Sequence, residues 1–283
     1  MNQSKSYPKV LSIAGSDSSG GAGIQADLKT FSALGVYGAT AITAITAQNT
    51  QGVNSQFAIE PQMVYDQIAA VMDDIEPSVV KIGMLSNTAI VEAVAKALHD
   101  YRPSFIILDP VIVSSTGHRL LSIEAQETIK EKLIPIADLL TPNIPEMKAL
   151  TDSSLSSLEE KKEAAQQLFN LGAKAILLKG GHEEGEVKTD VLFYKGQQST
   201  DNGQQTLSMF TSETVVTKNT HGTGCTLSSA IAAFIARGLS LEDAISEAKN
   251  YVTEAIRAGA DINIGKGIGP VNHFFNPQKM IVL

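Results

Sequence analysis

The chain has 283 residues, of which 43% are hydrophobic, and its 30 acidic and 22 basic residues give a formal net charge of −8. Because acids and bases are interspersed, the composition excludes a basic stripe for nucleic acid or an anionic membrane, and the single cysteine excludes an intramolecular disulfide. No apolar leader follows the start and no apolar run is long enough to cross a bilayer, so we expect a cytoplasmic protein whose partners are small molecules.

Apolar strand-like segments alternate with segments of helical periodicity up to residue 181. Residues 10–15 predict a strand, and residues 23–35 predict a helix because Ile24, Leu28 and Phe31 recur at helical spacing before a glycine. Further strands are predicted at residues 39–49, 79–85, 105–113, 137–143 and 175–181. Further helices are predicted at residues 62–74, 87–101, 122–137 and 157–171. This alternation predicts βαβ units around a buried, mainly parallel sheet.

The rhythm changes between Val187 and Val216, where polar turns and alternating residues predict a small antiparallel ribbon at an edge or flap. Two helical segments follow, from Thr226 to Arg237 and from Leu241 to Ile262, and a glycine-rich tail comes after them. We find no internal repeat, low-complexity linker or shift in composition. The sequence therefore predicts a single domain over residues 1–283.

Polar and glycine-rich segments follow the predicted strands, at the edge where open α/β sheets bind ligands. The first such loop has the glycines of a degenerate dinucleotide fingerprint at residues 21–26, but the next strand ends at Gln48 and not at an acidic residue, which excludes NAD. No phosphate-binding GxxxxGK[ST] motif occurs. The glycines lie among Asp17, Ser18, Ser19 and Asp27, a clustering that favours a polar substrate pocket.

The only cysteine, Cys225, follows a Gly-Thr-Gly turn and precedes an apolar helical pattern. If a helix begins here, the backbone N–H groups of residues 222–225 converge on one volume that attracts anions, and the helix dipole stabilises charge on a transferring phosphoryl group. The same field is expected to lower the thiol pKa below about 8.5, which would make Cys225 a proton acceptor or a nucleophile. A buried structural cysteine is the alternative that the residues leave open.

The chain contains, in this order, the segments IAGSDSSGGAGIQADLKTFSALGVYG, AITAQNTQGV, KIGML, LDPV, TPNIPE, LKGGH, NTHGTGC and GKGIGPV. Together they resemble the hydroxymethylpyrimidine and phosphomethylpyrimidine kinases of thiamine biosynthesis over nearly the whole chain. The resemblance implies a ribokinase-like three-layer α/β/α sandwich with a mainly parallel central sheet and a small antiparallel edge or flap. Ribokinase-like proteins usually carry GAGD at the turn before the helix, with the aspartate as catalytic base, whereas this chain has GTGC.

The resemblance implies roles on the acceptor side of the site. Cys225 would accept the proton of the substrate hydroxymethyl group as that group attacks the γ-phosphate of ATP, beside an anion hole formed by Gly222, Thr223 and Gly224. Gln48 would hydrogen-bond the aminopyrimidine, because a side-chain amide can match a ring nitrogen and its exocyclic amine together. The other residues implied in the substrate pocket are Gly15, Asp27 and Met84.

On the nucleotide side, the resemblance implies that Asn143 and Glu146 help to hold Mg²⁺ and phosphate, with Asp109 as a second candidate for that network. Lys179 and Thr220 would contact ATP. The implied reaction uses MgATP to phosphorylate 4-amino-5-hydroxymethyl-2-methylpyrimidine and then its monophosphate, which yields the diphosphate used for thiamine. A homodimer is usual in the family.

Two alternatives remain at this stage. A pyridoxine or pyridoxal kinase of vitamin B6 salvage would share the fold, ATP, magnesium and anion hole, and Gln48 and Met84 favour the pyrimidine over it. A non-catalytic nucleotide-binding regulator would also keep the fold. The set formed by Cys225, Gly224 and the NxxE motif argues against the regulator.

Overall fold

A computed structural model of the chain describes residues 5–112, 120–181, 185–195 and 205–283. The strands are β1 (Lys9–Asp17), β2 (Tyr37–Asn49), β3 (Gly52–Ala58), β4 (Val79–Ile82), β5 (Phe105–Leu108), β6 (Leu139–Leu140), β7 (Ala175–Leu178), β8 (Val187–Lys195) and β9 (Gln205–Glu213). The helices are α1 (Gly23–Ala33), α2 (Pro61–Asp74), α3 (Thr88–Tyr101), α4 (Ile123–Lys132), α5 (Ile144–Thr151), α6 (Leu158–Asn170), α7 (Thr223–Ala236) and α8 (Leu241–Gly259), with a 3₁₀ turn at Ile134–Ile136.

The strands form one sheet in the order β3-β2-β1-β4-β5-β6-β7-β8-β9. The pairs from β2 through β1, β4, β5 and β6 to β7 are parallel, and β3, β8 and β9 join the two edges antiparallel. This arrangement confirms the predicted mainly parallel sheet and the antiparallel pairing after Val187; residues 196–204 of that predicted ribbon lie outside the described ranges. The antiparallel strand β3 was not predicted, because its sequence GVNSQFA has neither a continuous apolar run nor a regular alternation of apolar and polar residues.

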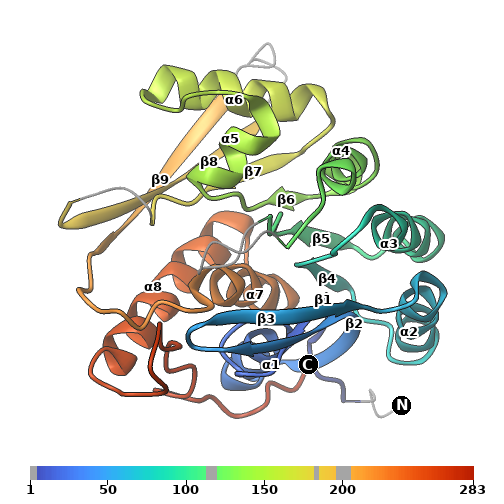
Figure 1. Cartoon of the computed structure of the whole chain (residues 1–283), viewed down its shortest axis with the longest axis horizontal. Coiled ribbons are helices and arrows are strands. Elements are labelled where there is room, and N and C mark those ends of the chain that lie inside the picture. The colour runs from blue at the N-terminus through green and yellow to red at the C-terminus, as the bar shows by residue number, and fades with distance from the viewer. Residues whose placement is uncertain (1–4, 113–119, 182–184, 196–204) are drawn as a thin grey trace.

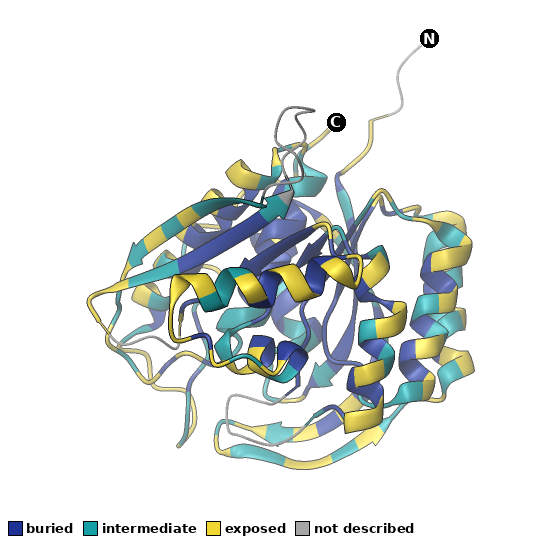
Figure 2. Ribbon diagram, turned by 90° about the horizontal axis from the view of Figure 1, so that it is seen from above, coloured by how far each residue is buried: buried dark blue, intermediate teal, exposed yellow. Residues whose placement is uncertain are grey.

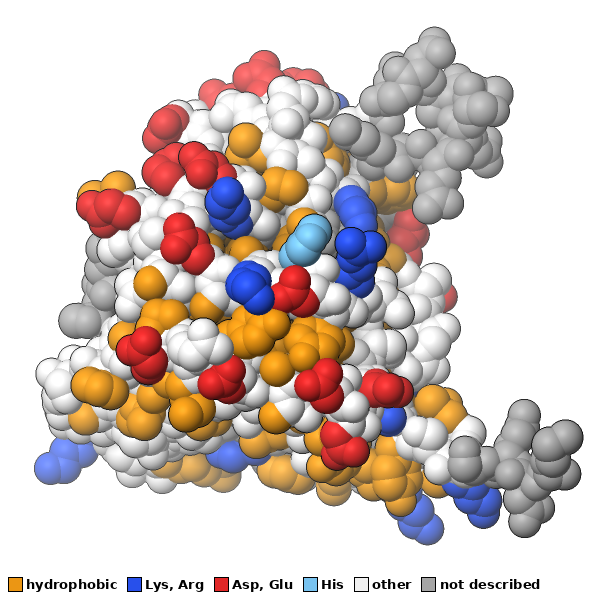
Figure 3. Space-filling model, turned by 90° about the vertical axis from the view of Figure 1, so that its right-hand side faces the viewer, with side chains coloured by type: hydrophobic (Ala, Val, Ile, Leu, Met, Phe, Trp, Pro, Cys, Tyr) orange, Lys and Arg blue, Asp and Glu red, His pale blue; other side chains and the backbone are white. Residues whose placement is uncertain are grey.

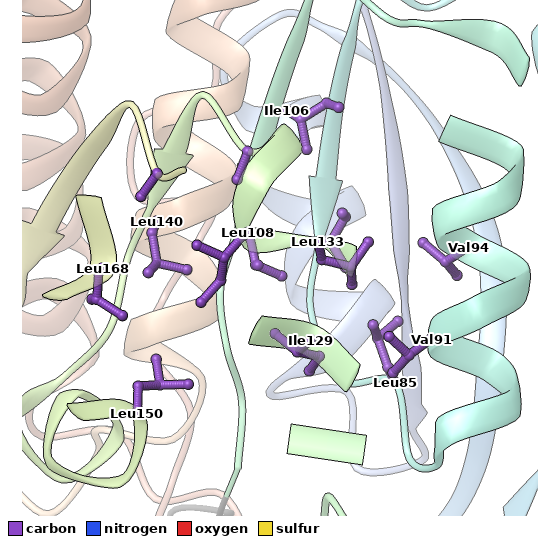
Figure 4. Packing of buried hydrophobic residues seen from close by; sticks show 14 of the residues in the cluster. Leu85, Val91, Val94, Ile106, Leu108, Ile129, Leu133, Leu140, Leu150 and Leu168 are labelled. Atoms are coloured by element: carbon purple, nitrogen blue, oxygen red, sulfur yellow. The ribbon is translucent and has the colours of Figure 1, made fainter. Parts of the chain in front are cut away.

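Helices cover both faces of the sheet, which confirms the three-layer architecture (Figure 1). Each central strand packs against the helices on both faces of the sheet, because successive side chains of a strand point to opposite faces. Strand β5 is an example. Ile106 and Leu108 pack with α2 to α6, and Ile107 packs with α1, α7 and α8. Figure 4 shows part of the first cluster, with Leu108 between Leu140 and Leu133. In Figure 2 the buried residues of the helices face the sheet and the exposed ones face outward.

The outer surface over α2, α3 and α4 carries charges of both signs around small apolar areas, as Figure 3 shows. This face therefore has no continuous basic stripe of the kind that binds nucleic acid. Within the described ranges, no helix combines the length and the hydropathy that crossing a bilayer requires.

Candidate active site

A cavity of about 760 Å³ opens where the carboxyl ends of the parallel strands meet the start of α7. This volume is within the range of small-molecule sites. The cavity brings together all of the predicted site residues except Asp27: Gly15, Gln48, Met84, Asp109, Asn143, Glu146, Lys179, Thr220, Gly222, Thr223, Gly224 and Cys225. Since these residues come from seven separate loops and strand ends, their meeting follows from the parallel topology.

The turn before α7 requires glycine for both conformational and steric reasons. Gly222 caps the helix with a φ of 80°, in the left-handed region. A Cβ added to Gly222 would lie 1.8 Å from the carbonyl oxygen of Gly21 in the first loop. The two glycine-rich segments therefore pack backbone against backbone, which is possible only without side chains. Helix α7 begins at Thr223, as the anion-hole hypothesis requires.

Three backbone donors at this turn are available to a ligand. The N–H groups of Gly222, Gly224 and Cys225 make no hydrogen bond to another described residue, whereas the N–H of Thr223 donates to the carbonyl of Thr220 at 3.3 Å. The unused donors lie at the positive end of α7, where they favour an anion. Three of the four predicted donors are therefore available to an anion, and the Thr223 N–H is partly engaged.

The thiol of Cys225 is partly buried in the cavity wall, and its pKa is not lowered as predicted. Burial raises the pKa of the Cys225 thiol to about 11; Lys81 opposes this rise, while Asp27 and Asp109 add to it. The prediction was wrong because it considered the helix dipole without the loss of hydration. In the absence of ligands Cys225 is consequently a neutral thiol at pH 7.

Gln48 belongs to a hydrogen-bonded cluster that includes Asp17, from the polar first loop, and His221, which was not among the predicted site residues. Asp17 accepts hydrogen bonds from Ser19 N at 2.8 Å and Ala22 N at 2.9 Å, and its Oδ2 lies 2.8 Å from His221 Nε2. Burial would raise the pKa of Asp17, but the hydrogen bonds from His221 and Ser19 hold it at about 2. The position of His221 directly before the GTGC turn was the available signal.

A second cluster lines the cavity at the ends of β5 and β7. Lys179 Nζ lies 2.7 Å from Asp109 Oδ1 and 3.7 Å from Glu146 Oε2. Burial would raise the pKa of Asp109, but Lys179 and Lys81 hold it below its ordinary value. Burial raises the pKa of Glu146 to about 7, with Asp109 adding to the rise and Lys179 opposing it.

The N-terminus of α5 fixes the position of Glu146. The side chain of Asn143 accepts from Glu146 N at 2.8 Å, and Glu146 Oε2 accepts from Asn143 N at 2.7 Å, which is a complete capping box. Among the described residues no group of three acidic, histidine or cysteine side chains forms a ready metal cage. Two carboxylates beside a phosphate site nevertheless suit Mg²⁺, which keeps several waters and takes phosphate oxygens as ligands. The residues present therefore fit a magnesium ion bound together with a nucleotide.

Asp27 does not line the cavity; it lies beneath it, and this corrects the prediction. Its carboxylate contacts Lys81 Nζ at 3.0 Å and accepts from Ser12 Oγ at 2.5 Å and from Ser229 Oγ at 2.6 Å. Asp27 and Lys81 are both completely buried. The face of α1 that carries Asp27 is turned toward β1 and α7, which a helical pattern alone does not specify. Burial would lower the pKa of Lys81, but Asp27 holds it above its ordinary value.

Comparison with known proteins identifies close relatives. A family model described as phosphomethylpyrimidine kinase matches residues 17–272. The Escherichia coli hydroxymethylpyrimidine/phosphomethylpyrimidine kinase is 46% identical over 266 residues, which cover 94% of this chain and 97% of that protein. The Geobacter sulfurreducens thiamine biosynthesis bifunctional protein ThiED is 46% identical over 281 residues, and the match covers 99% of this chain and 55% of that longer protein.

A solved structure of the Bacillus subtilis pyridoxal kinase, an ADP complex, has the same fold. It superposes with a TM-score of 0.83 at 36% identity, covering 95% of this chain and 98% of that one. This chain is therefore also similar to a pyridoxal kinase, but its sequence identity to that protein, 36%, is lower than its identity of 46% to the Escherichia coli pyrimidine kinase.

Proposed function

We propose that Cys225, the Gly222–Gly224 turn and Gln48 form the acceptor site of this chain, which belongs to the phosphomethylpyrimidine kinase family. The chain is an ATP-dependent kinase of hydroxymethylpyrimidine and its monophosphate in thiamine biosynthesis. The observation that carries this assignment is that all three open into one cavity with the Asp109–Lys179–Glu146 cluster. The cavity thus offers an acceptor half and a phosphate half in contact with each other.

Phosphoryl transfer depends mainly on positioning and on stabilising charge, and the turn before α7 supplies both. The N–H groups of Gly222, Gly224 and Cys225 donate hydrogen bonds that stabilise the negative charge on the transferring phosphoryl group. Cys225 takes the proton of the attacking hydroxymethyl oxygen. Because its pKa is about 11 without ligands, only a small fraction is thiolate at pH 7, so the rate should rise with pH.

Asp109 and Glu146 are the residues that would hold Mg²⁺, through its water shell and together with the phosphates of ATP. When bound, the ion supplies positive charge beside the phosphates. Lys179, which already lies 2.7 Å from Asp109, contributes a second positive charge on the same side of the cavity. Asn143 pairs with Lys179 at this cluster, and Thr220 also lines the cavity; these two residues complete the proposed nucleotide contacts.

Pyridoxal phosphorylation is a second candidate activity. The observation that favours it is the close superposition on the Bacillus subtilis pyridoxal kinase, with a TM-score of 0.83. Gln48 and Met84 favour the aminopyrimidine, because an amide offers an adjacent acceptor and donor. We therefore propose that pyridoxal, if it is accepted at all, is the weaker substrate.

Steady-state kinetics of Cys225→Ala and Cys225→Ser between pH 7 and 9 test the role of the thiol. We expect kcat of the parent to rise about tenfold per pH unit below the pKa, and kcat of both variants to fall by about 10²- to 10⁴-fold and to lose this slope. A matched control is Thr128→Ala on the exposed side of α4, which should keep the parent profile. A variant that retained the parent rate and slope would remove Cys225 from proton transfer.

A further inference from the structure

The side-chain amide of Gln48 makes two contacts whose donor and acceptor characters conflict. Gln48 Oε1 lies 3.1 Å from Thr46 Oγ1, and Gln48 Nε2 lies 3.3 Å from His221 Nε2. The Thr46 hydroxyl also lies 2.9 Å from the carbonyl oxygen of Ser16, which can only accept. A hydroxyl has one hydrogen, so its donation to Ser16 leaves two acceptor oxygens, those of Thr46 and Gln48, facing each other.

The carboxylate of Asp17 determines the state of the histidine nitrogen in the second contact. Asp17 Oδ2 is 2.8 Å from His221 Nε2, and the pKa of Asp17 is about 2, so the carboxylate can only accept at neutral pH. His221 Nε2 therefore carries a hydrogen that it donates to Asp17. In that state His221 Nε2 has no lone pair for an N–H group of Gln48.

A half-turn of the Gln48 amide removes both conflicts. The terminal torsion of glutamine is broad and roughly two-fold, so the two orientations fill nearly the same space. After the half-turn, Oε1 accepts from His221 Nε2–H, which it shares with Asp17, and Nε2 donates to Thr46 Oγ1. We propose that Asp17 and His221 are positioning residues that select this orientation, and so fix the order in which Gln48 presents its remaining acceptor and donor to the substrate.

This order matters for substrate selection, an argument that rests on the proposed contact between Gln48 and the pyrimidine. An aminopyrimidine carries an N–H donor on its exocyclic amine next to a lone pair on the ring nitrogen, and only one orientation of the amide matches both. Without His221 the Thr46 hydroxyl can redirect its hydrogen from Ser16 to Gln48 Oε1, so the opposite orientation of the amide becomes accessible and the matching orientation is populated for only part of the time. The enzyme should then lose discrimination against a ring that lacks the amine.

Competing substrates give the direct test: hydroxymethylpyrimidine and its analogue without the 4-amino group. In His221→Leu we expect the ratio of the two kcat/KM values to fall about tenfold, the size of one oriented hydrogen bond, through a rise in KM for the aminopyrimidine with kcat changed less than about threefold. His221→Gln, whose amide nitrogen can still donate, should recover most of the ratio. The matched control His99→Leu changes an exposed histidine on α3 and should leave the ratio unchanged.

A double-mutant cycle with Gln48→Ala separates this inference from the proposed function. If His221 acts through Gln48, then His221→Leu has no further effect on the ratio in the Gln48→Ala background. Two results would overturn the positioning role and leave the role of Gln48 intact. One is that His221→Leu changes the ratio equally in the parent and in the Gln48→Ala background. The other is that both His221 variants keep the parent ratio while Gln48→Ala alters it. An unchanged ratio in Gln48→Ala itself would refute the role of Gln48, and this inference with it.

Discussion

Removal of the buried ammonium group of Lys81 is expected to cost more stability than any surface charge of this protein. Lys81 contacts both oxygens of Asp27 at 3.0 Å, and the side chains of both residues are 0% exposed. In Lys81→Met the aliphatic stem is largely replaced, so the main change is electrostatic. The Asp27 carboxylate keeps hydrogen bonds from Ser12 and Ser229 but loses its counter-charge.

The magnitude follows from that uncompensated charge. Breaking a buried ion pair by removing one partner costs about 3–5 kcal/mol, which is a large part of the stability of an ordinary domain. The double variant Lys81→Met/Asp27→Leu removes both charges and should recover at least about half of the loss. The matched control is Lys174→Met, because Lys174 pairs with Asp138 at 2.7 Å but is 62% exposed, and such pairs contribute about 0–1 kcal/mol.

Urea unfolding followed by far-ultraviolet circular dichroism measures these differences, with ΔG obtained by linear extrapolation. We expect Lys81→Met to unfold at a lower urea concentration than Lys174→Met, with the double variant between Lys81→Met and the parent. A Lys81→Met protein within about 1 kcal/mol of the parent would refute the reasoning. So would a double variant that is less stable than Lys81→Met.

Two further predictions concern the turn before α7 and the helix that follows it. Gly222→Ala should lower kcat at least about 100-fold, because its Cβ would overlap Gly21, whereas Gly238→Ala, also at positive φ but with no atom within 4 Å, should keep the activity in the same assay. Burial lowers the pKa of His273 to about 4, so the stability of the parent relative to His273→Gln, measured by urea unfolding, should fall by about 3 kcal/mol as pH drops from 6.5 to 4.

The sign of the His273 effect follows from which state binds the proton more readily. An unfolded histidine has a pKa of 6.5 and the folded one about 4, so protons favour the unfolded chain throughout that interval. His273 Nε2 lies 3.0 Å from Thr226 Oγ1 inside the protein. A difference in stability between the parent and His273→Gln that is the same at pH 6.5 and pH 4 would contradict this account. For Gly222, the contradicting result is a parent-like kcat in Gly222→Ala.

The alternation of apolar and amphipathic segments was sufficient to predict the sheet, its layers and the loops that carry the site. Strand β3 was not predicted because its mixed sequence has no strand pattern of its own, and its structure depends on pairing with β2. The cavity was predictable for a different reason: parallel strands place all of their carboxyl ends at one edge.

Burial and helix rotation, in contrast, could not be derived from the sequence. The pKa of Cys225 depends on desolvation by neighbours that are distant in sequence, and this outweighs the helix dipole. The position of Asp27 depends on which way α1 is turned against the sheet. The sequence did weakly indicate the buried ion pair of Lys81. A lysine within the apolar segment VVKIGML faces the same side of the sheet as Val79, where a buried ammonium group requires a buried partner.

Mass analysis of the products is the most direct test of the central claim that this cavity phosphorylates the pyrimidine twice. Purified protein is incubated with MgATP and, separately, with hydroxymethylpyrimidine, its monophosphate and pyridoxal. We predict pyrimidine monophosphate and then diphosphate, with the rate of product formation from the pyrimidine at least about 100-fold lower in Cys225→Ala under the same conditions. Phosphate that appeared on pyridoxal alone would contradict the account.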